Sequence, residues 1–571
     1  MFGREVCVLP ELEPGTLQKV ISPEPRAPKM SDEIAAEWTF LVLGAAALGM
    51  ACLLALLPAA GHDQMWLLYA AGRMLRGAPL YGSRIFETNP PLILWLSVIP
   101  EWLSHITHLT DTSLGKLFVA ALEVGIAVLS RHIVRLAYPR ITRAAEYGLA
   151  FVYISVFAVM PARDFGQRDH LLILLLLPYI FAAGVRARGF ALPVRLGWLV
   201  GALGLAGVVL KPHQVLIPIT VELALLVRRT AARQAEFRMP FLRPEIYAMF
   251  ISGVAFLGAI AVFAPLYFTQ VLPIVRDTYW AYHQLTPGQL LTAAVQLHIL
   301  GALDLVLLFR IGWRRVSGFV WVLLIAGLSS TLAYYIQGTG WYYQQIPALS
   351  ILALSFAFLL VELSEQRTPK TRPKCPNWLP IAAAGLAVLA LVLTAHFMDY
   401  PFTPERSFPV DTPDPAFFSG LGPGSAVMTL SPTIDYTIQP IYKYHLTLGQ
   451  RYPALLMMPA ILRSEDPQGG PVTLHLSAER VAELDSMQRR FILEDLRRWH
   501  PALLLVQRCQ DPAVHCQSLE DRHDNMLAWF LRDPAFREQF AHYQFMRTAG
   551  EFDGYVLRSR PDQHVVSPYN R

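Results

Sequence analysis

The sequence has few charged residues. Asp, Glu, Lys and Arg together make up 16% of its 571 positions, whereas a soluble domain usually carries about 25%. Hydrophobic residues make up 54%, and the mean hydropathy is +0.37. This balance excludes a water-soluble globule and indicates a chain that crosses a membrane several times.

The sequence also lacks the common motifs of cofactor chemistry. It has no HExxH or paired CxxC spacing, no glycine-rich nucleotide loop and no GxSxG elbow. ATP-driven and NAD-dependent reactions therefore have no support, and no metal-ligand set is predicted. The net charge of +5 comes without a basic face carrying interleaved aromatics, so we expect no nucleic-acid partner.

Cysteine is scarce, with five residues in all. Cys509 and Cys516 lie close together in the polar C-terminal part; they pair if that part faces an oxidising compartment and otherwise stay reduced. Residues 1–29 are polar and proline-rich and lack the apolar core of a cleavable signal peptide. Translation can start at Met1 or at Met30, and we expect residues 1–36 to form a disordered cytoplasmic tail.

Apolar runs of membrane-spanning length recur along the chain and predict about eleven transmembrane helices. They cover residues 38–59, 114–136, 146–161, 170–185, 196–210, 214–227, 247–267, 291–309, 318–337, 344–362 and 379–396. We therefore expect an all-α polytopic membrane domain over residues 37–397.

Arginine-rich connections set the expected orientation, because cationic loops stay on the cytoplasmic side. The basic connections cover residues 131–143, 186–195, 228–243, 310–315 and 367–374. They occupy alternate loops only if residues 91–105 form an amphipathic helix on the outer surface rather than a span. The N-terminus is then cytoplasmic, and residues 61–113 form an outer loop.

The tail changes composition and predicts an extracytoplasmic α/β domain over residues 398–571. Strand-like runs at 425–430, 502–507 and 555–559 alternate with helical patterns at 478–499 and 525–543.

Charged side chains in the expected outer loops are candidates for chemistry. Asp63 follows the first span, where a carboxylate can take up a proton or instead cap the next helix. The loop PARDFGQRDH carries Arg163, Asp164, Arg168 and Asp169, which can bind a phosphate and act as acid or base, or can simply neutralise one another.

Two further outer loops carry a cation and aromatic residues. Lys211 lies in a tight Lys-Pro-His hairpin, where it either snorkels to the interface or binds an anion. The aromatic groups around Tyr282 and Trp341 are either membrane-interface anchors or surfaces that stack on a sugar or a prenyl chain.

The combination of these elements resembles the GT-C superfamily of membrane glycosyltransferases, in particular protein O-mannosyltransferases and the bacterial lipid A aminoarabinose transferase. The resemblance rests on Asp63 after the first span, the YAAGRMLRGAPLY helix and the ETNPPLILWL element, over about residues 38–362. That branch often has a lysine or histidine before the Pro-Pro pair, whereas this chain has Thr88 and Asn89.

The resemblance implies transfer of a sugar from a polyprenyl-phosphate donor to a lipid, glycan or protein acceptor, at the periplasmic side of a bacterial inner membrane. It assigns the catalytic roles to Asp63 and Asp169; a divalent cation remains open as a cofactor. The donor phosphate would contact Arg168, Lys211, His213, Arg163 and Arg84. The substrates would contact Asp164, Asn89, Tyr69, Tyr282, His283, Trp341 and Tyr342. A transporter or flippase for a polyprenyl-linked glycan is the alternative.

Overall fold

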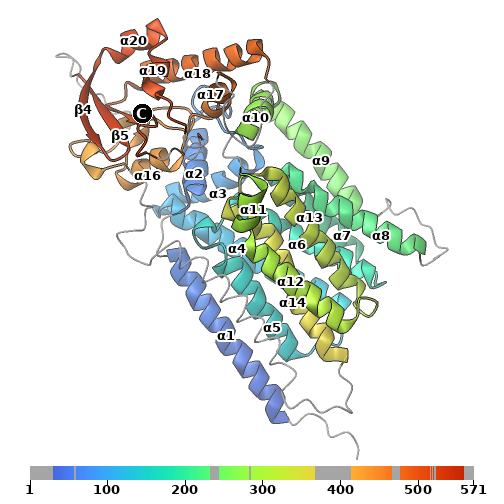
Figure 1. The fold of residues 1–571 in the computed structure, drawn as a ribbon. Helices are drawn as coiled ribbons and strands as arrows, with labels where there is room; N and C mark the ends of the chain where they lie inside the picture. The colour runs from blue at the N-terminus through green and yellow to red at the C-terminus, as the bar shows by residue number, and fades with distance from the viewer. Residues whose placement is uncertain are drawn as a thin grey trace, which may run out of the picture.

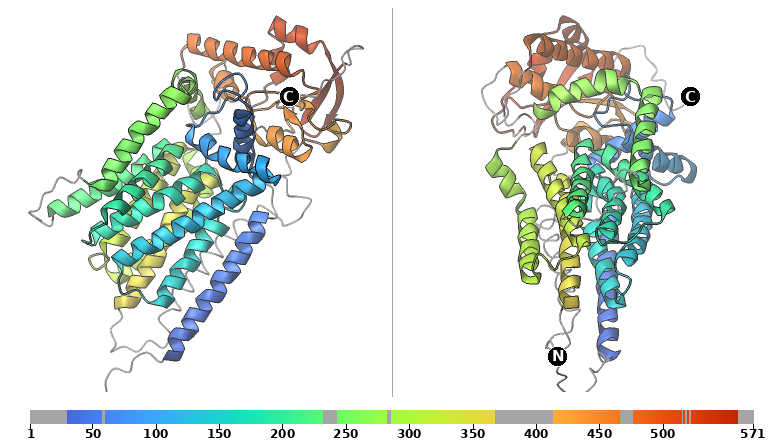
Figure 2. Two further views of the ribbon diagram at one scale, coloured as in Figure 1. Left: turned by 180° about the vertical axis from the view of Figure 1, so that it is seen from behind. Right: turned by 90° about the vertical axis from the view of Figure 1, so that its right-hand side faces the viewer.

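The computed structural model describes residues 30–56, 60–231, 243–281, 285–366, 413–465, 476–514, 516, 519 and 522–558. It has two parts, a bundle of long helices and a smaller domain with a sheet (Figure 1). The small domain sits on one end of the bundle, and the N-terminal helix α1 runs to the opposite end (Figure 2).

The described residues of the bundle form helices and loops and contain no strand. Its helices are α1 Met30–Leu56, α2 His62–Leu75, α3 Leu92–Thr107, α4 Asp111–Ala137, α5 Arg143–Ile154, α6 Arg168–Ala187, α7 Val194–Leu210, α8 Leu216–Ala231, α9 Pro244–Phe263, α10 Leu272–Thr278, α11 Pro287–Ala293, α12 Val295–Ile311, α13 Gly318–Gln337 and α14 Ile346–Gln366. Short π or 3-10 turns lie at Ser155–Val159, Ala162–Asp164, Pro212–Val215, Tyr267–Val271, Tyr279–Ala281 and Tyr342–Gln345.

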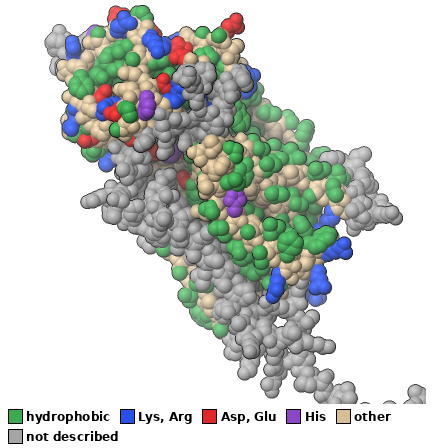
Figure 3. Space-filling view, in the orientation of Figure 1, with side chains coloured by type: hydrophobic (Ala, Val, Ile, Leu, Met, Phe, Trp, Pro, Cys, Tyr) green, Lys and Arg blue, Asp and Glu red, His purple; other side chains and the backbone are tan. Residues whose placement is uncertain are grey.

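Each apolar run expected up to residue 362 is mostly helical in its described residues, and the run at 379–396 lies outside the described residues. Among the described helices, 6 are long and apolar enough to cross a membrane, or 7 if the bent pair α11 and α12 is one span. Hydrophobic side chains cover much of the visible bundle (Figure 3). The chain is a membrane protein, and the larger number of spans stays a prediction.

Helix α6 forms the centre of the bundle. Its sequence is apolar on every side, and every residue from Asp169 to Val185 is buried, as expected of a helix that neighbours surround. The α7 glycines let that helix approach closely: a Cβ on Gly207 would lie 2.7 Å from the Leu172 backbone oxygen. Small residues at helix contacts are typical of membrane bundles.

The two ends of α6 carry separate groups of charges. At its C-terminal end, Arg186 lies 2.9 Å from Glu222 and 2.5 Å from Glu245. Asp169 lies in the first turn, at the other end of the helix. Buried charges need partners, so each end of the bundle has its own ion pairs.

The C-terminal domain contains a five-stranded mixed sheet in the order β2-β1-β3-β5-β4. β1 Ala426–Leu430 pairs in parallel with β2 Thr447–Leu448 and β3 Leu503–Gln507, and β5 Phe552–Leu557 runs antiparallel to β3 and to β4 Tyr543–Ala549. The helices are η8 Pro415–Phe417, α16 Asp435–Lys443, α17 Met458–Glu465, α18 Ala478–Trp499, α19 Met526–Phe530 and α20 Pro534–Phe540.

Most of the expected elements of this domain are confirmed, including the helix at 478–499. The continuous helix expected at 525–543 is wrong, because α19 ends and α20 restarts at Pro534. Proline lacks the N–H that would continue the first helix, and the Asp533 side chain accepts from the Ala535 N–H at 2.8 Å as a new N-cap. A disulfide joins Cys509 and Cys516.

The packing of α7 on α6 predicts that Gly207→Ala destabilises the bundle, because the new methyl group would clash with the Leu172 carbonyl. The expected loss is about 1–3 kcal/mol, seen as a lower midpoint of thermal unfolding in lipid nanodiscs. The control is Gly258→Ala in α9, where a Cβ meets nothing within 4 Å. An equal or higher midpoint for Gly207→Ala would contradict this packing.

Candidate active site

Asp63 lies in the first turn of α2 and faces the second expected outer loop. Its Oδ2 accepts a hydrogen bond from Gln167 Nε2 at 2.8 Å and an ion-paired one from Arg168 at 3.1 Å. His62 Nε2 lies 3.5 Å from Oδ1. The helix N-cap is Gly61, without a side-chain cap. Asp63 therefore connects the start of α2 to the start of α6. Because no side chain caps α2, the interpretation of Asp63 as a helix cap is wrong.

The surroundings of Asp63 hold it as a carboxylate. Burial by itself would raise its pKa, but the charge of His62 when that imidazole is protonated, the charge of Arg168 and the hydrogen bonds from Gln167 and Arg168 lower the pKa to about 2. Ionised Asp63 stabilises the fold fully above pH 3.8, and the contribution is lost as the pH falls through about 2. Asp63 is thus an ionised hydrogen-bond acceptor near neutral pH.

Asp169 forms a second ion pair directly beside the first. Its carboxylate is fully buried, and Lys211 Nζ lies 2.8 Å from Oδ2. The ammonium group also lies 5.0 Å from the centre of the Tyr343 ring. Burial lowers the pKa of Lys211, and the Asp169 charge opposes that effect. Because Lys211 is only 5% exposed and turns inward, it does not snorkel.

The two ion pairs form one charge-balanced cluster, since Arg168 and Asp169 are consecutive residues. Each pairs with a residue from another segment, so the loop does not simply neutralise itself. Nearby His213 is neutral, because burial and the charges of Lys211 and Arg168 lower its pKa to about 3. Two of the predicted cations, Arg168 and Lys211, are therefore engaged with carboxylates.

Glu87 is a buried carboxylate of this region that was not predicted. It accepts hydrogen bonds from the backbone N–H groups of Thr88 and Asn89 at 2.8 and 3.0 Å, from the Asn89 amide and from the Trp66 indole. Its charge also acts on Arg168. Thr88 and Asn89, which precede the Pro-Pro pair, thus both donate to a carboxylate. The Glu-Thr-Asn-Pro order could have indicated this turn.

The other predicted residues divide into three groups. Trp341 stacks on Tyr343, with 5.7 Å between the ring centres. The Tyr342 hydroxyl donates to the Met160 carbonyl at 3.1 Å. Tyr342 also lies within electrostatic range of Asp164. Tyr69 and Arg84 lie at the contact with the C-terminal domain. Tyr282, His283 and the side chain of Arg163 lie outside the described residues.

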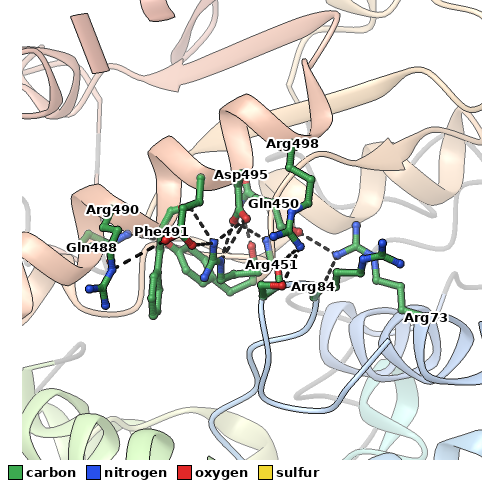
Figure 4. Close-up of polar contacts among 12 residues, drawn as sticks. Arg73, Arg84, Gln450, Arg451, Gln488, Arg490, Phe491, Asp495 and Arg498 are labelled. Atoms are coloured by element: carbon green, nitrogen blue, oxygen red, sulfur yellow. Dashed lines mark hydrogen bonds and ion pairs between the residues drawn. The ribbon is translucent and has the colours of Figure 1, made fainter. Parts of the chain in front are cut away.

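Arg73 fastens α2 to the C-terminal domain (Figure 4). Its buried guanidinium donates to the backbone carbonyls of Arg84 at 2.7 Å, Gln450 at 2.9 Å and Leu448. Tyr69 supports the contact, because its hydroxyl accepts from the Leu448 N–H at 2.9 Å. The segment between α1 and α4 is therefore built against the C-terminal domain.

Within the part of the chain that the structure describes, no group of three or more His, Cys, Asp or Glu side chains is placed to hold a metal ion. The residues Asp63 and Asp169 instead have cationic partners.

Comparison with known proteins gives a match at the level of the fold. No protein-family model and no curated protein matches the sequence. Among solved structures, the chain is similar to ArnT from Cupriavidus metallidurans in the apo state, with a TM-score of 0.52 and 13% identity over 92% of this chain and 98% of ArnT. The fold is of the GT-C type. Because 92% of the chain is covered, the likeness reaches beyond residues 38–362 into the C-terminal domain.

A second similar structure is the apo form of the Archaeoglobus fulgidus oligosaccharyltransferase. It has a TM-score of 0.43 and 13% identity, over 92% of this chain and 75% of that protein.

The Arg73 contact predicts that Arg73→Ala destabilises docking of the C-terminal domain, because the Leu448, Gln450 and Arg84 carbonyls lose a buried charged donor. We expect a loss of at least about 2 kcal/mol, measured as faster hydrogen exchange around β2 and a lower unfolding midpoint. Arg84→Ala is the control, since this exposed residue contributes only its backbone carbonyl. Equal effects of the two changes would contradict the assignment.

Proposed function

We propose that the protein is a glycosyltransferase that moves a sugar from a polyprenyl-phosphate donor to a lipid, glycan or protein acceptor on the periplasmic side of a bacterial inner membrane. The observation that carries the proposal is the ionised Asp63 beside the Arg168, Asp169 and Lys211 cluster, in an ArnT-like fold. The residue roles that follow are part of the same proposal.

Asp63 acts on the acceptor. Oδ2 is occupied by Gln167 and Arg168, so Oδ1 is the oxygen that receives the acceptor hydroxyl. The hydroxyl oxygen attacks the anomeric carbon with inversion, its proton passes to Asp63, and the bond from that carbon to the lipid phosphate breaks. The products are the glycosylated acceptor and the polyprenyl phosphate.

The cations receive the departing phosphate. Among the described residues, Arg168 Nε and His213 Nε2 are buried polar atoms without a hydrogen-bond partner. An unpaired buried donor is costly, so a phosphate oxygen on Arg168 Nε would relieve that cost while Asp63 keeps its own bond. Lys211 adds a second positive charge to the cluster, beside the Tyr343 ring.

Two features support the outer orientation of this site. The Cys509–Cys516 disulfide belongs to the domain that packs on the same end of the bundle as Asp63, and disulfides persist in oxidising compartments. The arginine-rich connections predicted to be cytoplasmic include the one that begins at Arg186, at the opposite end of α6.

The test incubates purified protein with radiolabelled polyprenyl-phosphate sugars and membrane glycan acceptors. Asp63→Asn keeps the shape of the side chain but removes its charge, so we expect transfer to fall about 100-fold or more. Transfer by the Asp169→Asn variant should fall too, because Lys211 loses its ion-pair partner. Asp524→Asn, which disturbs only a pair with Arg522 in the C-terminal domain, is the matched control.

Retained transfer in both site variants would contradict the residue roles. Movement of intact lipid-linked sugar across the membrane, without transfer to any acceptor, would contradict the function and support the transporter instead.

A further inference from the structure

His62 lies between two carboxylates that come from different parts of the molecule. Its Nδ1 is 2.8 Å from Oδ1 of Asp435, and its Nε2 is 3.5 Å from Oδ1 of Asp63. Asp435 is the first residue of α16 in the C-terminal domain, whereas His62 and Asp63 begin α2. One imidazole therefore connects the candidate base to the C-terminal domain.

The contact with Asp435 fixes which ring nitrogen carries a proton. A carboxylate 2.8 Å from Nδ1 favours a proton on that nitrogen, and in the neutral ring this leaves the lone pair on Nε2, which faces Asp63. Asp435 is itself held, because its Oδ1 also accepts from the Gln439 amide at 2.9 Å. The ring is thus oriented as a proton acceptor towards Asp63.

Helix α16 is firmly placed on the outer loop. The Tyr442 hydroxyl lies 2.7 Å from Oδ2 of Asp111 and 3.1 Å from the Met65 carbonyl. These contacts join α16 to α2 and α4 independently of His62. The separation of Asp435 from His62 is therefore set by docking of the domain.

We propose that His62, oriented by Asp435, relays the proton that Asp63 takes from the acceptor hydroxyl, so that the C-terminal domain completes the active site. The inference rests on the proposed glycosyl transfer. The hydroxyl proton moves to Asp63 Oδ1 and then to His62 Nε2, Asp435 stabilises the resulting imidazolium, and the proton leaves to water. Asp63 returns to its carboxylate form for the next turnover.

The chemistry of the three groups makes this relay downhill. A carboxylic acid ordinarily gives up its proton at about pH 3.9 and an imidazolium at about pH 6.5, so the proton passes from Asp63 to a neutral His62. Asp63 and Asp435 face the imidazole, and Arg168 reaches Asp63 from α6. Asp435 thus acts as a positioning residue for His62.

The first measurement is the pH dependence of transfer. The wild-type rate should fall on the acid side as His62 becomes protonated, since Asp63 stays ionised there. His62→Gln should lower kcat about 100-fold and remove this acid limb. Asp435→Asn should lower kcat roughly tenfold and move the limb to lower pH by about one unit, because a negative charge beside the imidazolium is lost. The donor KM should stay unchanged.

The matched control is Tyr442→Phe, which removes docking bonds of the same helix but keeps the Asp435 carboxylate. The Arg73 and Tyr69 contacts still dock the domain in this variant. It should leave the acid limb where it is in the wild type. An Asp435→Asn profile that matches that of Tyr442→Phe would overturn the relay, because the carboxylate would then serve docking alone.

The second measurement needs no sugar donor. Nitrogen-15 NMR of histidine-labelled protein in nanodiscs, with the His62 signal assigned by its loss in His62→Gln, should show the Nδ1–H tautomer at about pH 8 and a mixture of tautomers in Asp435→Asn. An unchanged tautomer would overturn the inference. If the wild type transfers no sugar, the proposed function is wrong, while this spectrum still decides the His62–Asp435 pair.

Discussion

The ion pair between Asp63 and Arg168 is the contact on which the candidate site depends. It joins the start of α2 to the start of α6, two segments more than a hundred residues apart in the chain. Taking either charge out of water without its partner would cost several kcal/mol. The segment that begins at Asp63 is therefore tied to α6, in which every residue from Asp169 to Val185 is buried. Asp169 and Lys211 form their own pair immediately beside this contact.

The same need for partners explains how the C-terminal domain is attached. Arg73 sits at the contact with its guanidinium on three backbone carbonyls, and Arg451 of the domain is held by Asp495 and Glu494 (Figure 4). The backbone carbonyl of Arg451 in turn accepts from the Phe86 N–H at 2.8 Å, next to Glu87. Polar contacts thus extend from the sheet domain to the loop that lies beside Arg168.

The segment before the Pro-Pro pair carries no cation, so a phosphate at this site would need positive charge from other residues. Thr88 and Asn89 donate to Glu87, so that segment holds a negative charge of its own. The positive charge of the site comes instead from Arg168 and Lys211, which are buried and already balanced by carboxylates. A phosphate would then be met by a preorganised, electrically neutral cluster, whose donors cost no reorganisation.

The helical class, the approximate places of the described apolar helices up to residue 362, the α/β tail and the candidates Asp63, Asp169 and Lys211 all followed from the sequence alone, because hydropathy and charge are local properties of the chain. The broken helix at Pro534 was readable too, since proline and the Asp533 cap act locally. Only the tertiary structure decided that Lys211 turns inward, that Glu87 is buried and that Asp435 meets His62. Those contacts join residues far apart in sequence, and packing rather than pattern fixes which charges become partners.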